Sequence, residues 1–282
     1  MSGRDFDLDG YLTRVGHAGR REPTLAVLRG IVAAHAATIP FENIDVFTRR
    51  GVSLDACALQ RKMVQARRGG YCFEQNSLLR EALLALGFGV TGLMARVVRG
   101  MDADAITQRT HMMLRVDLLE GPHVADVGFG NLTPTLPLGL APQECETRHE
   151  RYRLTPLRDE WLLQARLARK WANIYRFALQ PQFEIDYEVG NWFTSTRPGG
   201  MFVENLVVAR PGEACRLTLF NRSFAVRHLD GRTERREMRH AEDFRTTLAD
   251  AFGLVLHDDE LELLMGALDE RPSSGAPHAF FA

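Results

Sequence analysis

Cys72 lies in a segment that could make it a nucleophile, Arg67-Arg68-Gly69-Gly70-Tyr71-Cys72-Phe73-Glu74-Gln75-Asn76. Apolar residues recur at helical spacing after it and Gly87 follows, so the pattern predicts a helix over 73–86 with the cysteine at its N-terminus. The unpaired N–H groups at a helix start favour a thiolate, and Arg67 and Arg68 add positive potential. The alternative is a small apolar side chain tucked under a helix, which is the common role of a free cysteine.

Two residues downstream could complete a catalytic triad with Cys72. Residues 110–118 alternate as a strand that turns His111 away from the face of its apolar neighbours. A second short strand, 124–127, carries Asp126 in an apolar setting before a glycine-rich turn. A buried carboxylate needs a hydrogen-bond donor, and an imidazole can supply one. The order Cys72, His111, Asp126 therefore predicts nucleophile, base and orienting carboxylate, as in acyl transfer. A structural histidine and a turn-starting aspartate are the alternatives.

At this point the chain resembles the arylamine N-acetyltransferase family of the prokaryotic type. The resemblance covers most of residues 5–210, and the cysteine segment is its most specific part. The matching segments are Arg68-Gly69-Gly70-Tyr71-Cys72-Phe73-Glu74-Gln75-Asn76, Thr110-His111-Met112, Asp126-Val127-Gly128-Phe129-Gly130, Ile39-Pro40-Phe41-Glu42-Asn43-Ile44-Asp45 and Phe202-Val203-Glu204-Asn205-Leu206.

The resemblance implies a role for each triad residue. Cys72 would be the acetylated nucleophile, His111 its ion-pair partner and general base, and Asp126 the residue that holds the imidazole. Acetyl-CoA would be the co-substrate, and an arylamine, arylhydrazine or arylhydroxylamine would accept the acetyl group in a ping-pong reaction of xenobiotic metabolism.

The resemblance also implies two binding regions. Gly128, Phe129 and Gly130 would border the coenzyme A site, and Phe41, Phe129 and Phe202 would line an apolar pocket for the aromatic amine. The segment 196–201, just before Phe202, is unusually rich in glycine for this family. The family's acceptor preference is therefore the property that the resemblance carries over least to this chain.

Other functions remain open on the sequence alone. The same triad serves hydrolases and transglutaminase-like enzymes, and papain-like proteases place a cysteine helix against a histidine strand in the same way. A related amide-forming enzyme could use another acyl donor or acceptor. A catalytically silent binding protein is the alternative from another class.

Composition and length agree with a cytoplasmic enzyme. The chain has 282 residues and a formal net charge of −1, so no overall field attracts nucleic acid or an anionic membrane. No apolar run is long enough to span a membrane, and the first residues are polar. Four scattered cysteines form no disulfide framework and no C-x-x-C pair, so we expect no metal. The sequence leaves the oligomeric state open.

The periodicity predicts an α+β fold in three units, and the triad residues give it a Cys-His-Asp arrangement that resembles that of papain-like enzymes. We expect a helical domain at 1–88 that carries the nucleophile. A central antiparallel, barrel-like domain at 89–205 would carry the histidine and aspartate, and a mixed α/β lid would follow at 206–282. Further expectations are helices within 8–38 and 53–88, strands near 90–97, 110–118, 123–127 and 187–194, an undecided segment 161–170, strands 206–209 and 215–220, a hairpin 224–238 around Asp230-Gly231, helices 241–252 and 258–268, and a tail 271–282.

Overall fold

The computed structural model describes residues 6–271, so most of the predicted tail lies outside the described residues. The first part is helical, as predicted, with α1 (Leu8–Val15) and α2 (Leu25–Thr38) ahead of α5 (Cys72–Ala85). Gly16 ends α1 in the left-handed region at φ 73°, and the Thr24 hydroxyl caps α2. Shorter helices, α3 (Ile44–Phe47) and α4 (Ala56–Leu59), lie between, and a π-helical segment, Gln60–Gln65, extends α4.

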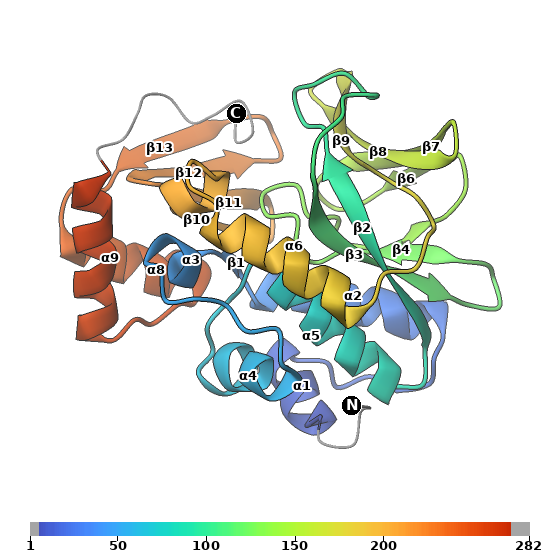
Figure 1. The fold of residues 1–282 in the computed structure, drawn as a ribbon, viewed down its shortest axis with the longest axis horizontal. Coiled ribbons are helices and arrows are strands. Elements are labelled where there is room, and N and C mark those ends of the chain that lie inside the picture. Colours follow the sequence, from blue (N-terminus) through green and yellow to red (C-terminus); the bar gives the residue numbers. More distant parts are fainter. Residues whose placement is uncertain (1–5, 272–282) are drawn as a thin grey trace.

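The central part is an eight-stranded antiparallel sheet that curves into a barrel-like shape (Figure 1), which confirms the predicted class. Its order is β5-β4-β3-β2-β9-β8-β7-β6, and the segment 161–170, left undecided above, is mostly strand β8 with the turn into β9. The strands are β2 (Gly89–Val97), β3 (Arg109–Asp117), β4 (His123–Ala125), β5 (Leu138–Gly139), β6 (Glu144–Glu146), β7 (Arg151–Leu157), β8 (Glu160–Leu167) and β9 (Lys170–Phe177).

The predicted strand 187–194 is wrong, because this segment belongs to helix α6 (Glu184–Thr196). Its β-branched and aromatic residues suggested a strand, but the buried positions recur at helical spacing. Tyr187 and Asn191 are buried, four residues apart, while Val189 and Trp192 on another face are exposed. In Figure 1 this helix crosses the front of the molecule between the two sheets.

The C-terminal part forms a second antiparallel sheet with helices packed beside it, as predicted. After α7 (Met201–Glu204) come β10 (Val207–Pro211), β11 (Cys215–Phe220), β12 (Ser223–His228), β13 (Thr233–Glu237), α8 (Ala241–Phe252) and α9 (Asp258–Glu270). The short strand β1 (Phe41–Glu42) from the first part completes this sheet by pairing with β10. A segment near the start of the chain and the C-terminal third therefore share one sheet.

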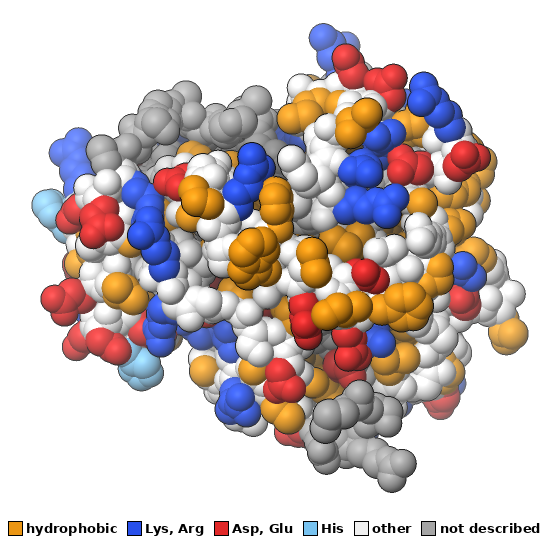
Figure 2. Space-filling model, viewed as in Figure 1, with side chains coloured by type: hydrophobic (Ala, Val, Ile, Leu, Met, Phe, Trp, Pro, Cys, Tyr) orange, Lys and Arg blue, Asp and Glu red, His pale blue; other side chains and the backbone are white. Residues whose placement is uncertain are grey.

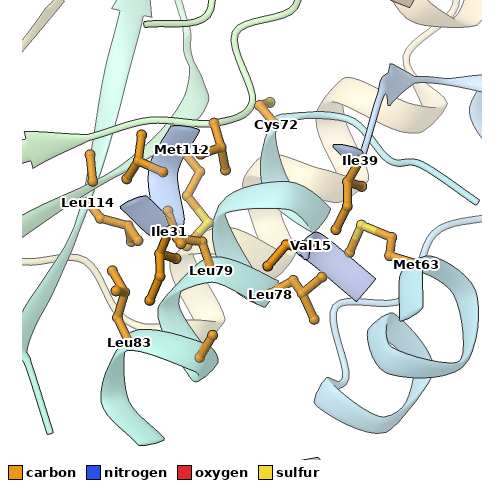
Figure 3. Close-up of a cluster of buried hydrophobic side chains, with 14 of the residues drawn as sticks. Val15, Ile31, Ile39, Met63, Cys72, Leu78, Leu79, Leu83, Met112 and Leu114 are labelled. Carbon is orange, nitrogen blue, oxygen red and sulfur yellow. The ribbon is translucent and has the colours of Figure 1, made fainter. Parts of the chain in front are cut away.

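Helix α5 lies at the centre of the largest apolar cluster. Leu78, Leu79 and Leu83 on this helix are fully buried and pack with Ile31 of α2 and Met112 of β3. Figure 3 shows these side chains along α5, with Cys72 at one end of the helix. Packing on both sides holds α5 in place, and with it the start of the helix. Among residues 6–271, no helix is both long and apolar enough to cross a membrane.

Two glycines in helix interiors test this packing. A Cβ at Gly190 in α6 would lie 2.8 Å from Phe73 Cζ and 2.7 Å from Met94 Cε, whereas a Cβ at Gly266 in α9 meets nothing within 4 Å. Gly266→Ala should stabilise the protein by about 0.5–1 kcal/mol, through helix propensity. Gly190→Ala should destabilise it by about 1–3 kcal/mol, because overpacking outweighs the same gain. Urea unfolding of both variants measures the difference, and equal stabilities would show that α6 is not docked this closely.

Candidate active site

Cys72 is the first residue of α5, as the sequence predicted. The Tyr71 N–H, just before the helix, donates to Glu74 Oε2 at 3.1 Å, which fixes the first turn. Cys72 is 2 % exposed, and its Sγ lies 3.6 Å from the carbonyl oxygen of Thr110 on β3. The tight docking of α5 on β3 therefore brings the thiol next to the residue that precedes His111.

His111 lies between Asp126 and Cys72. Its Nε2 donates to Asp126 Oδ2 at 2.7 Å, which leaves Nδ1 for its hydrogen bond with Cys72. Burial alone would lower the pKa of His111, but the charge of Asp126, its hydrogen bond and the contact with Cys72 raise that pKa to about 10. The imidazole is therefore held as an imidazolium across the neutral pH range.

Asp126 is buried, and donors surround its carboxylate. Oδ1 accepts from Asn76 Nδ2 at 3.0 Å and from the Gly128 N–H at 2.9 Å, while Oδ2 accepts from His111. Burial opposes ionisation here, but the His111 charge and these hydrogen bonds outweigh it and lower the pKa of Asp126. The carboxylate stays charged and fixes one orientation of the histidine ring.

Asn76 is a site residue to which the sequence reasoning gave no role. Its Nδ2 donates to the Met112 carbonyl at 2.8 Å as well as to Asp126, and its Oδ1 accepts from the Val127 N–H at 3.1 Å. One side chain thus joins α5 to β3 and to the segment after β4. Its position four residues after Cys72, one helical turn along the same face, was the available signal.

Gly128 lies directly against the start of α5. A Cβ at this position would lie 2.7 Å from the Cys72 Cα and 2.9 Å from Asn76 Nδ2, so only glycine fits. Gly130 has φ +84°, and a Cβ there would contact the Phe41 ring at 3.7 Å. The predicted coenzyme A segment, Gly128 to Gly130, therefore runs past both Cys72 and the predicted acceptor pocket.

The three predicted pocket phenylalanines gather around the site from separate parts of the chain. The rings of Phe41 and Phe202 are 5.6 Å apart, and Phe202 meets the ring of Tyr71, next to the nucleophile, at 6.0 Å. Phe129 packs edge-on against His111 at 5.1 Å, and Tyr175 lies 5.0 Å from the same imidazole. Aromatic surface therefore surrounds the imidazole and the neighbourhood of Cys72.

The expected electrostatic role of Arg68 needs revision. Its guanidinium contacts the carboxylates of Glu42, Asp45 and Glu260, at 2.9, 3.4 and 2.8 Å. A cation paired in this way contributes little positive potential at Cys72. The buried cation nearest the thiol is instead His111.

Comparisons with known proteins identify the family of this chain. A family model described as N-acetyltransferase matches residues 24–261. The arylamine N-acetyltransferase of Mycolicibacterium smegmatis is 43 % identical over 258 residues, covering 90 % of this chain and 94 % of that protein. That of Escherichia coli (strain K12) is 36 % identical, covering 95 % and 98 %. The structure of the Mycobacterium marinum arylamine N-acetyltransferase in complex with CoA superimposes with a TM-score of 0.89 at 38 % identity, covering 94 % and 99 %. The chain belongs to the arylamine N-acetyltransferase family.

Proposed function

We propose that this enzyme transfers an acetyl group from acetyl-CoA to the nitrogen of an arylamine, arylhydrazine or arylhydroxylamine through an acetyl-cysteine at Cys72. The observation that carries the proposal is the hydrogen-bonded chain from Cys72 through His111 to Asp126, in which Nε2 and Oδ2 are 2.7 Å apart. This order of groups supports the papain-like arrangement expected from the sequence. Family membership supports the choice of donor and acceptor.

In the first half-reaction the Cys72 thiolate attacks the thioester carbonyl of acetyl-CoA. The bond from the carbonyl carbon to the coenzyme A sulfur breaks, and the leaving thiolate takes the Nδ1 proton of His111. Acetyl-Cys72, neutral His111 and free coenzyme A result. Asp126 keeps its charge throughout, so the ring cannot turn away from the sulfur.

In the second half-reaction the neutral amine attacks the acetyl carbonyl on Cys72. His111 takes a proton from the amine nitrogen, the carbon–sulfur bond breaks, and the thiolate–imidazolium pair is restored. One site serves both steps, which predicts ping-pong kinetics. Arylamines are weak bases and are neutral near pH 7, whereas alkyl amines are largely protonated, so the chemistry itself favours aromatic acceptors.

We assign the two substrates to adjoining surfaces. Gly128, Phe129 and Gly130 would border the coenzyme A site, and the relative with bound CoA supports a coenzyme A substrate. Phe41, Phe129 and Phe202 would line the acceptor pocket, supported by the contacts of Phe41 with Phe202 and of Phe129 with His111. The apolar surroundings favour acetyl transfer to the amine over hydrolysis.

The division into domains 1–88, 89–205 and 206–282, with the last acting as a lid, is part of the proposal. So is a cytoplasmic location. Strand β1 of the first unit pairs with β10 of the third, so these two units share one sheet. They are separate in sequence but not separate in the folded structure.

A hydrolase or transglutaminase-like enzyme with the same triad is the competing activity. Release of acetate or ammonia separates it from the proposed one. With acetyl-CoA and an aromatic amine together, N-acetylated product should form far faster than free acetate.

Cys72→Ser should fold but lose acetyl transfer, because a serine hydroxyl is not ionised by this imidazole. After brief exposure to acetyl-CoA alone, mass spectrometry of the intact wild-type enzyme should show one added acetyl group, and analysis of its peptides should place that group on Cys72. The variant should show none. Cys57→Ser, at an exposed cysteine, is the matched control and should acetylate normally. Substantial transfer by Cys72→Ser would refute the covalent mechanism.

Asp126→Asn should lower kcat/KM by about 10⁴-fold, the loss seen in other triads when the histidine takes the wrong tautomer. Circular dichroism is needed beside the rate, because the buried amide must find new partners. Asn76→Asp provides a second test at the same carboxylate. It places a second negative charge next to Asp126 and should also slow transfer, and normal rates in both folded variants would exclude an orienting role for Asp126.

The pH dependence of alkylation tests the charge on His111. Because its pKa in the folded protein is raised to about 10, the imidazolium is present below that value and is lost as the pH rises through it. The rate of Cys72 alkylation by iodoacetamide should therefore change little between pH 6 and 8. A free thiol would instead lose about tenfold per unit below pH ~8.5. His111→Gln should restore that ordinary slope, and a wild-type enzyme that already shows it would lack the ion pair.

A further inference from the structure

A buried network of ion pairs joins the loop of residues 66–71, which leads into Cys72 and is called here the nucleophile loop, to the C-terminal helix α9. The Arg68 side chain is 8 % exposed and contacts three carboxylates: Glu42 of β1, Asp45 of α3 and Glu260 of α9. Glu42 is completely buried and Glu260 only 14 % exposed. A surface ion pair contributes little to stability, but buried partners with this geometry constrain one another strongly.

The network has two arms. In the first, Lys62 joins Asp45 and Glu74, each at 2.7 Å, and Glu74 accepts the Tyr71 N–H at the start of the nucleophile helix. This arm supports the start of the Cys72 helix and includes no residue of α9, although it shares Asp45 with Arg68. In the second arm, Arg68 joins β1 to α9 through Glu42 and Glu260.

The second arm sets the distance between the nucleophile loop and the predicted acceptor pocket. The Glu42 N–H donates to the Gly70 carbonyl at 3.1 Å, and the Gly70 N–H donates to the Pro40 carbonyl at 3.4 Å. A Cβ on Gly69 would lie 2.2 Å from the same Pro40 oxygen, so the two segments are in direct backbone contact. Phe41 lies between these contacts. The Arg68–Glu42 pair therefore clamps the strand that carries Phe41 onto the loop that leads to Cys72.

Glu260 anchors this clamp from the far end of the chain. It lies in the first turn of α9, where Oε2 accepts the His257 N–H at 3.1 Å and caps the helix. Its other oxygen, Oε1, accepts from Arg68 at 2.8 Å and from Arg50 at 3.1 Å. The position of α9 is thus coupled to the orientation of the Arg68 guanidinium.

We propose that Glu260 is a positioning residue for the acceptor half-reaction, through which the C-terminal helix α9 sets the place of Phe41 relative to Cys72. The inference rests on the proposed function, since it assigns Phe41 to the acceptor pocket. Without the Glu260 charge, Arg68 keeps Glu42 and Asp45 as partners, so the fold persists. The guanidinium loses its charged contact with α9. Strand β1, which Arg68 holds through Glu42, can then shift relative to the nucleophile loop. Lys62 keeps its contacts with Glu74 and Asp45, so the first turn of α5 keeps its support, and we expect the attack of Cys72 on acetyl-CoA to change little.

Glu260→Gln tests the proposal in the full-length enzyme, with Glu262→Gln at an exposed position of the same helix as the matched control. Rapid mixing and mass spectrometry measure the two half-reactions separately: acetylation of Cys72 by acetyl-CoA, and deacetylation of acetyl-Cys72 by an arylamine such as 4-aminobenzoate. For Glu260→Gln we expect acetylation within twofold of wild type and arylamine-dependent deacetylation slower by on the order of tenfold, the scale of a sub-ångström misplacement. The control should match wild type in both steps.

Glu260→Asp keeps the charge on a shorter side chain and should show a smaller defect in the same half-reaction, which gives a second reading if the glutamine variant is poorly folded. Equal slowing of both half-reactions would mean that Glu260 only stabilises the protein, and no slowing of either would mean that α9 does not act on the site. Both results overturn the proposal. Failure of wild-type Cys72 to accept an acetyl group would instead overturn the proposed function.

Discussion

The Asp126 carboxylate is the group on which the geometry of the site depends. It is buried, so its charge is tolerated only because His111, Asn76 and the Gly128 N–H all donate to it. These donors come from β3, from α5 and from the turn after β4, and each must be in place for the others to be satisfied. A polar network that is complete in this way selects one packing of the helix on the sheet.

The same network keeps charged groups inside an enclosed site. Asp126 raises the pKa of His111 to about 10, so the imidazolium lies beside Cys72 at neutral pH. The close approach of Gly128 to the Cys72 backbone excludes any larger side chain there. Phe129 and Tyr175 cover the imidazole with aromatic surface. The charges of Asp126 and His111 are stable in this buried place because each group is hydrogen-bonded. The aromatic rings around the imidazole limit the access of water.

A second charged network links the site to the rest of the chain. Through Lys62 it reaches the first turn of α5, and through Arg68 it reaches β1 and the C-terminal helix α9. The pairing of β1 with β10 joins the same regions through backbone hydrogen bonds. The C-terminal third, where the sequence resemblance was weakest, is therefore in contact with the loop before the nucleophile. The proposed positioning role of Glu260 depends on this connection.

The sequence by itself determined the local elements and indicated the three residues of the proposed triad. The cysteine helix, the histidine strand, the barrel-like class and the C-terminal hairpin and helices could all be predicted, because apolar periodicity and turn residues are local signals. Helix α6 was mistaken for a strand, since its β-branched and aromatic residues favour strands and only its packing selects the helix. Tertiary structure alone decided the role of Asn76, the partners of Arg68 and the contact of Glu260 with the nucleophile loop. These interactions join residues distant in sequence, and no local pattern records which charged side chain will meet which partner once the chain has folded.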